Sequence, residues 1–181
     1  SKEDAVAQQS TVDIAYGRAH LPVRLPPGAD VSVIRKRKLA KLPDQHGAIR
    51  AALARPTGAS PLADLARGRK SACILICDIT RPVPNRLFLR PMIEQMTAAG
   101  IPFDRITVLV ATGLHRPNEG AELQELVGDR WVMAHVRVEN HYARNDADHV
   151  DLGITQGRAV PIKIDRRFVD ADLRIATGLV E

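Results

Sequence analysis

The order of apolar and polar positions divides much of the chain into alternating strands and helices. Continuous apolar runs, typical of strands buried on both faces, cover residues 71–77 and 106–111. Helical spacing of apolar residues follows each of them, over 85–99 and 118–127, and each of these stretches stops at a glycine. Because strands alternate with helices, the pattern predicts a parallel sheet with helices on its faces.

Weaker patterns extend this picture on both sides. Two alternating segments around Gly17 predict a β-hairpin, and Pro22 makes its second segment an edge strand. The segments of this hairpin are 11–16 and 19–25. The further expected elements are helices at 44–54 (Asp44 as N-cap) and 61–67, strands at 131–138 and 172–176, and a hairpin or a β-addition between Leu152 and Ile164. Asn85 and Asn118 are expected to cap their helices, and Pro91 either kinks the first of these or marks its real first turn. We therefore predict an α/β, Rossmann-like, mostly parallel sheet with helices on both faces, preceded by an N-terminal β-hairpin, with residues 1–10 as a flexible lead-in.

Polar clusters follow both buried strands directly. The first strand runs into Asp78-Ile-Thr-Arg-Pro-Val-Pro84, and the second runs into Ala111-Thr-Gly-Leu-His-Arg-Pro117. Open parallel sheets bind ligands at the carboxyl ends of their strands. We therefore expect the two clusters to share one ligand-binding edge.

The first cluster is expected to hold a cation in place. Its two prolines fix the backbone after Arg81, and arginine suits bidentate capture of a carboxylate or phosphate. Asp78 and Thr80 supply a carboxylate and a hydroxyl beside it. The alternative is an Asp78–Arg81 pair that only pins the turn.

The second cluster offers a base. Histidine is the commonest general base in proteins, so His115 could act on a substrate, while Gly113 permits a positive φ and Thr112 offers a hydroxyl beside backbone amides. By itself a histidine in this position is also typical of an ordinary surface loop. The other histidines, including His141 and His149, are interpreted as loop residues that match no zinc pattern.

Composition limits the function classes. The chain of 181 residues is 45% hydrophobic and 26% charged, as in a globular domain, with no membrane-spanning stretch or signal core, so a cytoplasmic location is expected. Net charge is +5, and the densest run of basic residues lies at 35–38. Aromatic residues make up only 3% and no nucleic-acid-reading motif occurs, so a solvated basic turn is the simpler interpretation.

Cys73 and Cys77 stand roughly 13 Å apart in an extended strand, too far for a disulfide. Buried free thiols are expected, with a C-x3-C metal site as the alternative.

Together, the two strand-end clusters resemble the N-terminal domain of the nickel-dependent lactate racemase family. The resemblance extends to Tyr16-Gly17, to Pro61-Leu-Ala-Asp-Leu-Ala-Arg-Gly68 and to Ala171-Asp-Leu-Arg-Ile-Ala-Thr-Gly-Leu-Val-Glu181. It covers the chain from about residue 11 onward. Residues 11–181 would then be the N-terminal catalytic domain of a racemase-like protein, cut before a second domain.

The resemblance implies a racemase or epimerase of small 2-hydroxy acids that uses a nickel pincer nucleotide. It assigns His115 and Asp78 to catalysis, Arg81 and Thr80 to substrate binding, and Thr112 and Gly113 to the cofactor side. The second catalytic histidine, the lysine that tethers the cofactor and the nickel-ligating histidine are expected beyond Glu181. This chain alone would then bind no metal or cofactor and be inactive, with the C-terminal domain as its partner and no role for nucleic acid or membrane. The alternative is a non-catalytic module on the same fold that binds an anion or nucleotide.

Overall fold

The structure, a computed structural model, describes residues 11–179, so the expected flexible lead-in at 1–10 lies outside the described residues. It divides into two compact units, residues 1–40 and 41–181. In the first unit, β1 (Thr11–Tyr16) pairs antiparallel with β2 (Ala19–Arg24). Gly17 adopts a φ of +57° in the turn between them, a conformation that glycine reaches without strain. The predicted hairpin is confirmed.

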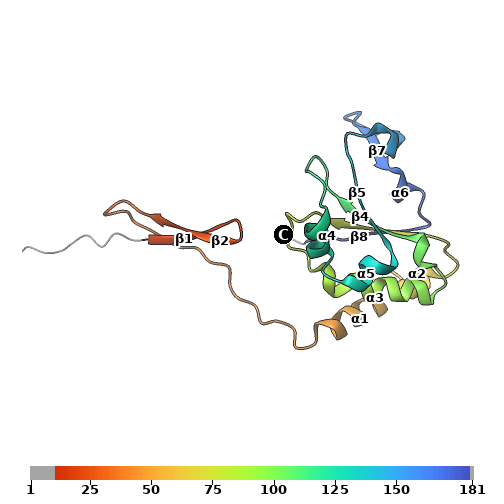
Figure 1. The fold of residues 1–181 in the computed structure, drawn as a ribbon, viewed down its shortest axis with the longest axis horizontal. Coiled ribbons are helices and arrows are strands. Elements are labelled where there is room, and N and C mark those ends of the chain that lie inside the picture. Colours follow the sequence, from red (N-terminus) through yellow and green to blue (C-terminus); the bar gives the residue numbers. More distant parts are fainter. Residues whose placement is uncertain (1–10, 180–181) are drawn as a thin grey trace, which may run out of the picture. The chain divides into compact units, whose positions relative to one another are not determined.

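A parallel sheet of four strands forms the centre of the second unit (Figure 1). The strands are β3 (Ala72–Cys77), β4 (Ile106–Ala111), β5 (Arg137–Asn140) and β8 (Leu173–Ala176). Their order is β5-β4-β3-β8, with β3 and β4 in the middle. The two segments that read as continuous apolar runs are thus the two central strands, because only these are buried on both faces.

The two faces of the sheet have different cores. Ile74 and Val108 point to a large apolar core, and Cys73 and Leu109 point to a small one. The helices are α1 (Gln45–Ala54), α2 (Leu62–Ala66), α3 (Asn85–Ala98), α4 (Gly120–Val127), α5 (Arg130–His135) and α6 (Arg166–Val169). Helices α3 and α5 lie on the side of the large core, and α6 lies on the other side (Figure 1). Helices on both faces of a mostly parallel sheet are therefore confirmed.

Short elements complete the second unit. The predicted hairpin near Leu152 is β6 (His149–Ile154) paired antiparallel with β7 (Pro161–Asp165). Two 3-10 turns, Phe103–Arg105 and Asp146–Asp148, precede β4 and β6.

Cys73 and Cys77 are free thiols, and burial raises the pKa of Cys73 to about 12, with the nearby Asp165 carboxylate adding to the effect. No helix in the described part of the chain is long and apolar enough to span a membrane.

The strand predicted at 131–138 is wrong over most of its length. Residues 130–135 form α5, and the strand β5 begins only at Arg137. Asp129 caps the helix by accepting a hydrogen bond of 2.8 Å from the Trp131 amide. The apolar run of this segment fits a buried helix as well as a strand, and the capping aspartate was the signal that distinguishes them.

The two predicted asparagine caps are also wrong, although the Asp44 cap is confirmed by its hydrogen bond to Gly47. Asn85 is the first residue of α3 and donates its side-chain amide to the Leu126 carbonyl at 2.9 Å. Asn118 lies two residues before α4. Its side chain accepts from the Ile79 amide and its backbone amide donates to the Asn140 side chain. Pro91 lies inside α3, so the first-turn alternative for it is excluded.

Candidate active site at the strand ends

Asp78 is fixed by the turn that follows β3. The Arg81 amide donates to the Asp78 carbonyl at 3.1 Å, which closes the turn. Inside it, one carboxylate oxygen of Asp78 accepts from the Thr80 amide at 3.1 Å and from the Thr80 hydroxyl at 2.6 Å. Asp78 is only 5% exposed. A hydrogen-bonded carboxylate in this position has one orientation, with its second oxygen left for another partner.

The partner of the second Asp78 carboxylate oxygen comes from the turn after β4. The His115 amide donates to the Thr112 carbonyl at 3.0 Å in a turn where Gly113 has a φ of +57°. This turn brings His115 Nδ1 to 2.5 Å from Asp78 Oδ2. The two clusters therefore meet, as expected, because β3 and β4 are parallel neighbours.

The pair has a defined protonation pattern. Burial by itself would raise the pKa of Asp78, but hydrogen bonds from Thr80 and His115 outweigh it and hold the pKa below its usual value. Asp78 is thus a carboxylate at neutral pH, and a carboxylate only accepts hydrogen bonds. His115 Nδ1 must therefore carry the ring proton. Its Nε2, on a side chain that is 60% exposed, is left to accept a proton.

Arg81 lies in the same turn and is exposed. Its guanidinium has no hydrogen bond or ion pair with any residue in the described range 11–179. The alternative of an Asp78–Arg81 pair is wrong, because the Asp78 carboxylate is taken up by Thr80 and His115. Backbone bonds from the Val83 amide to the Arg81 carbonyl and from the Asn85 amide to the Val83 carbonyl, both 2.8 Å, stiffen the chain behind Arg81. An exposed cation without a partner among residues 11–179 thus stands on a stiff segment, three residues after Asp78.

Two asparagines that the sequence did not assign to the site tie the strand ends together. Asn118 accepts from the Ile79 amide at 3.2 Å and donates to Glu122 at 2.8 Å. Its backbone amide and carbonyl are both bonded by the side-chain amide of Asn140, at 2.9 and 2.8 Å. The ends of β3 and β5 are connected through these buried side chains.

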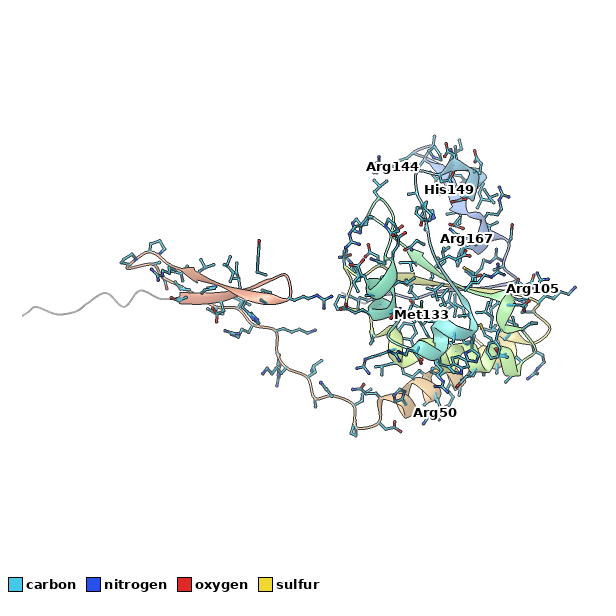
Figure 2. All side chains as sticks on the ribbon, in the orientation of Figure 1. Arg50, Arg105, Met133, Arg144, His149 and Arg167 are labelled. Carbon is cyan, nitrogen blue, oxygen red and sulfur yellow. The ribbon has the colours of Figure 1, made fainter. Side chains whose placement is uncertain are left out.

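His141, interpreted from the sequence as an ordinary loop histidine, is largely buried, with 18% of its side chain exposed. Its Nδ1 lies 2.9 Å from the Asp165 carboxylate, which also binds the Arg167 guanidinium at 2.7 and 3.0 Å. The Arg167 guanidinium also donates to the Glu139 carboxylate at 2.8 Å. The sequence missed this cluster because the strand end was placed at residue 138, three residues before His141. Figure 2 shows Arg167 and His149 on the side of the sheet opposite Met133.

A cavity of about 270 Å³ adjoins this second cluster. Gly113 and His141 lie on its wall together with Asp165, and Leu75, Leu109 and Phe168 give it an apolar lining. Within the described residues no group of three or more His, Cys, Asp or Glu side chains could hold a metal ion. The strand ends thus carry a histidine–carboxylate pair, an arginine without a partner among residues 11–179, and, next to the second cluster, an apolar recess.

These features define an α/β protein with a histidine–carboxylate pair at the carboxyl ends of its parallel strands. Comparison with known families agrees, because the family described as "Lactate racemase N-terminal domain" matches residues 16–181. The chain therefore belongs to the lactate racemase N-terminal domain family, as its resemblance indicated.

Characterised relatives show the same likeness over most of this chain. It is 28% identical over 174 residues to the lactate racemase of Thermoanaerobacterium thermosaccharolyticum, covering 95% of this chain and 40% of the relative. It is 32% identical over 141 residues to the lactate racemase of Lactiplantibacillus plantarum, covering 78% of this chain and 32% of the relative. The chain thus spans less than half the length of either racemase.

Solved structures agree in fold. The lactate racemase apoprotein from T. thermosaccharolyticum superposes with a TM-score of 0.72 at 27% identity, covering 92% of this chain and 38% of that one. A protein from Thermotoga maritima superposes with a TM-score of 0.57 at 19% identity, covering 72% of this chain and 32% of that one, which shows likeness of fold alone.

Proposed function

We propose that this chain supplies the acid–base and carboxylate-binding residues of a cytoplasmic 2-hydroxy-acid racemase or epimerase. The observation that carries the proposal is the Asp78–His115 pair, joined at 2.5 Å, with Arg81, which has no partner among the described residues, in the same turn as Asp78. Its membership of the lactate racemase N-terminal domain family supports a hydroxy acid as the substrate.

His115 is the proposed base for the substrate hydroxyl. Its Nε2 would take the hydroxyl proton when hydride leaves the adjacent carbon, and would return a proton in the reverse direction. Asp78 keeps Nδ1 protonated and stabilises the imidazolium that forms. The bond at 2.5 Å therefore both orients the ring and stabilises its charged state.

Arg81 is the proposed anchor for the substrate carboxylate. A guanidinium binds a carboxylate with two parallel hydrogen bonds, and this fixes the orientation of the carbon that reacts. Thr80, expected to bind substrate, donates its hydroxyl to Asp78, so it would act on the substrate only through that carboxylate.

The family resemblance implies a nickel pincer nucleotide, which when bound accepts hydride from the substrate carbon and returns it to either face. The described residues do not fit a nickel site, because they contain no cluster of three ligating side chains. We therefore assign no nickel ligand to them and propose that the chain alone is inactive. Gly113, on the wall of the cavity, is the proposed cofactor-lining residue.

The decisive experiment uses the longer parent protein, matured with cofactor. His115→Ala should lower the rate of interconversion of 2-hydroxy-acid enantiomers or epimers by about 10²- to 10⁴-fold, because a general base contributes that much. The matched control is His135→Ala, since His135 stacks on Trp131 at 4.3 Å and takes no part in the site. Chiral chromatography of the products measures both variants.

Normal turnover in His115→Ala would remove this residue from the mechanism. A parent protein that binds anions through Arg81 but interconverts none of the hydroxy acids offered would instead favour the non-catalytic binding module.

A further inference from the structure

A buried hydroxyl connects the turn that carries His115 to the segment after β5. Thr112 is 3% exposed, and its hydroxyl donates to the His141 carbonyl at 2.5 Å. The carbonyl of the same threonine accepts the His115 amide at 3.0 Å. His115 is thus connected through Thr112 to the segment that follows β5.

That segment is itself firmly held. The His141 amide donates to the Val110 carbonyl at 3.0 Å, and its ring is bound to Asp165 at 2.9 Å. The Asp165 carboxylate receives two bonds from the Arg167 guanidinium and one from the Arg167 amide, and this guanidinium also donates to the Asn140 carbonyl at 3.0 Å. The carbonyl that accepts the Thr112 hydroxyl is therefore fixed from both sides, by the sheet and by an ion-pair cluster.

The His115 ring needs such support. It is mostly exposed, and within residues 11–179 its ring has one hydrogen bond, to Asp78. The adjacent Gly113 gives the turn the freedom of a residue at positive φ. Asp78 is oriented by Thr80, so the remaining variable in the His115–Asp78 geometry is the position of the turn, and a displacement of about 1 Å can cost about 100-fold in rate.

We propose that Thr112 is a positioning residue, whose hydroxyl, anchored on the His141 carbonyl, holds the turn so that His115 Nδ1 meets Asp78. This role deepens the proposed function and rests on His115 as its base. It differs from the cofactor-lining role that the family resemblance implied for Thr112, because the hydroxyl proton is directed at His141 rather than at a ligand.

The test compares Thr112→Ala with Thr112→Ser, which restores the hydroxyl. In the 181-residue chain, ¹⁵N spectra of the histidine rings report which nitrogen of His115 carries the proton. We expect the wild type and Thr112→Ser to show the Nδ1–H form, and Thr112→Ala to show a mixture of both tautomers with faster amide exchange at His115. A threonine that served only the fold would not change the tautomer of a folded variant.

Activity gives the second measurement. In the cofactor-loaded parent protein, Thr112→Ala should lower kcat at least about tenfold with little change in KM, and Thr112→Ser should recover most of the loss. Because the tautomer measurement needs neither substrate nor cofactor, its result stands even if the racemase proposal fails.

Two outcomes would overturn the positioning role. One is a folded Thr112→Ala variant that keeps the Nδ1–H tautomer and its amide protection. The other is loss of the far-ultraviolet circular dichroism of both Thr112→Ala and Thr112→Val, which would assign the hydroxyl to the stability of the whole sheet.

Discussion

Asp78 and Asp165 are both buried carboxylates paired with a histidine, but their surroundings give them different tasks. Burial by itself would raise the pKa of Asp165, yet hydrogen bonds from Arg167 and His141 lower it to about 2. With a guanidinium on the carboxylate, that pair is a fixed structural cluster. No arginine among residues 11–179 hydrogen-bonds to the Asp78 carboxylate; its hydrogen-bonded partner is His115, whose side chain is 60% exposed.

The low pKa of Asp165 predicts an acid-sensitive contribution to stability. Because its pKa when folded is about 2 against an ordinary 3.8, the carboxylate stabilises the fold above about pH 4. That contribution, about 2 kcal/mol, is lost as the pH falls from about 5 to about 2. Asp165→Asn should therefore lower the free energy of unfolding at pH 7, and the difference from wild type should shrink toward pH 2. Urea unfolding at a series of pH values measures this.

Asp146→Asn is the matched control for that substitution. Asp146 also pairs with a cation, Lys163 at 3.1 Å, but its side chain is 82% exposed. We expect a change of less than about 1 kcal/mol at any pH, since exposed ion pairs contribute little. A gap between Asp165→Asn and wild type that did not vary with pH would contradict the role of the Asp165 charge.

At the scale of elements, the edge depends on how the loops after the strands are joined to one another. The buried side-chain amide of Asn140 bonds both backbone groups of Asn118, as a neighbouring strand would. Asn118 in turn accepts the Ile79 amide behind β3. Two asparagines thus continue the connection of β3 with β5 beyond the end of the sheet, around the turn that carries His115.

This connection predicts a cost for Asn140→Ala. The substitution leaves the Asn118 amide and carbonyl buried without partners, which should lower the free energy of unfolding by about 2–3 kcal/mol. Asn145→Ala, in an exposed loop with one side-chain bond to Asp148, should change it by less than about 0.5 kcal/mol. Equal values from chemical denaturation of the two variants would show that the asparagine pair does not hold the edge.

At the scale of the whole molecule, the chain consists of two units, and the apolar clusters that stabilise the sheet belong to the second. Among the described residues, the apolar clusters of the sheet begin at Leu53. The hairpin of β1 and β2 has only two strands, and such a hairpin is marginally stable by itself. Several of its apolar side chains, Tyr16 and Leu21 among them, are exposed.

We therefore predict that deleting residues 1–40 leaves the sheet unit folded. Thermal unfolding followed by circular dichroism should remain cooperative, with a Tm within a few degrees of the full chain. Deleting residues 161–181 is the control that should unfold, because it removes β8 from the sheet and α6 from its second face. Loss of cooperative unfolding on removal of residues 1–40 would show that the hairpin belongs to the same folding unit.

The sequence predicted those features that local pattern controls. The apolar runs at β3 and β4 identified the two central strands, since a strand buried on both faces has no polar side. The clusters behind them identified Asp78, Arg81 and His115 as candidate site residues, because strand ends of a parallel sheet share an edge. It was less reliable at 130–138, where an apolar run fits either a helix or a strand.

By itself, then, the sequence determined the family, the parallel sheet and the edge that carries the polar residues. Only the tertiary structure decided which of these residues are partners: Asp78 pairs with His115 rather than with Arg81, and Thr112 bonds to His141. The reason is that a buried polar group takes the partner that the register of neighbouring strands brings to it, and His115 and Asp78 are 37 positions apart in the chain. Periodicity reports which side of an element is buried, whereas hydrogen-bond partners depend on the meeting of elements far apart in sequence.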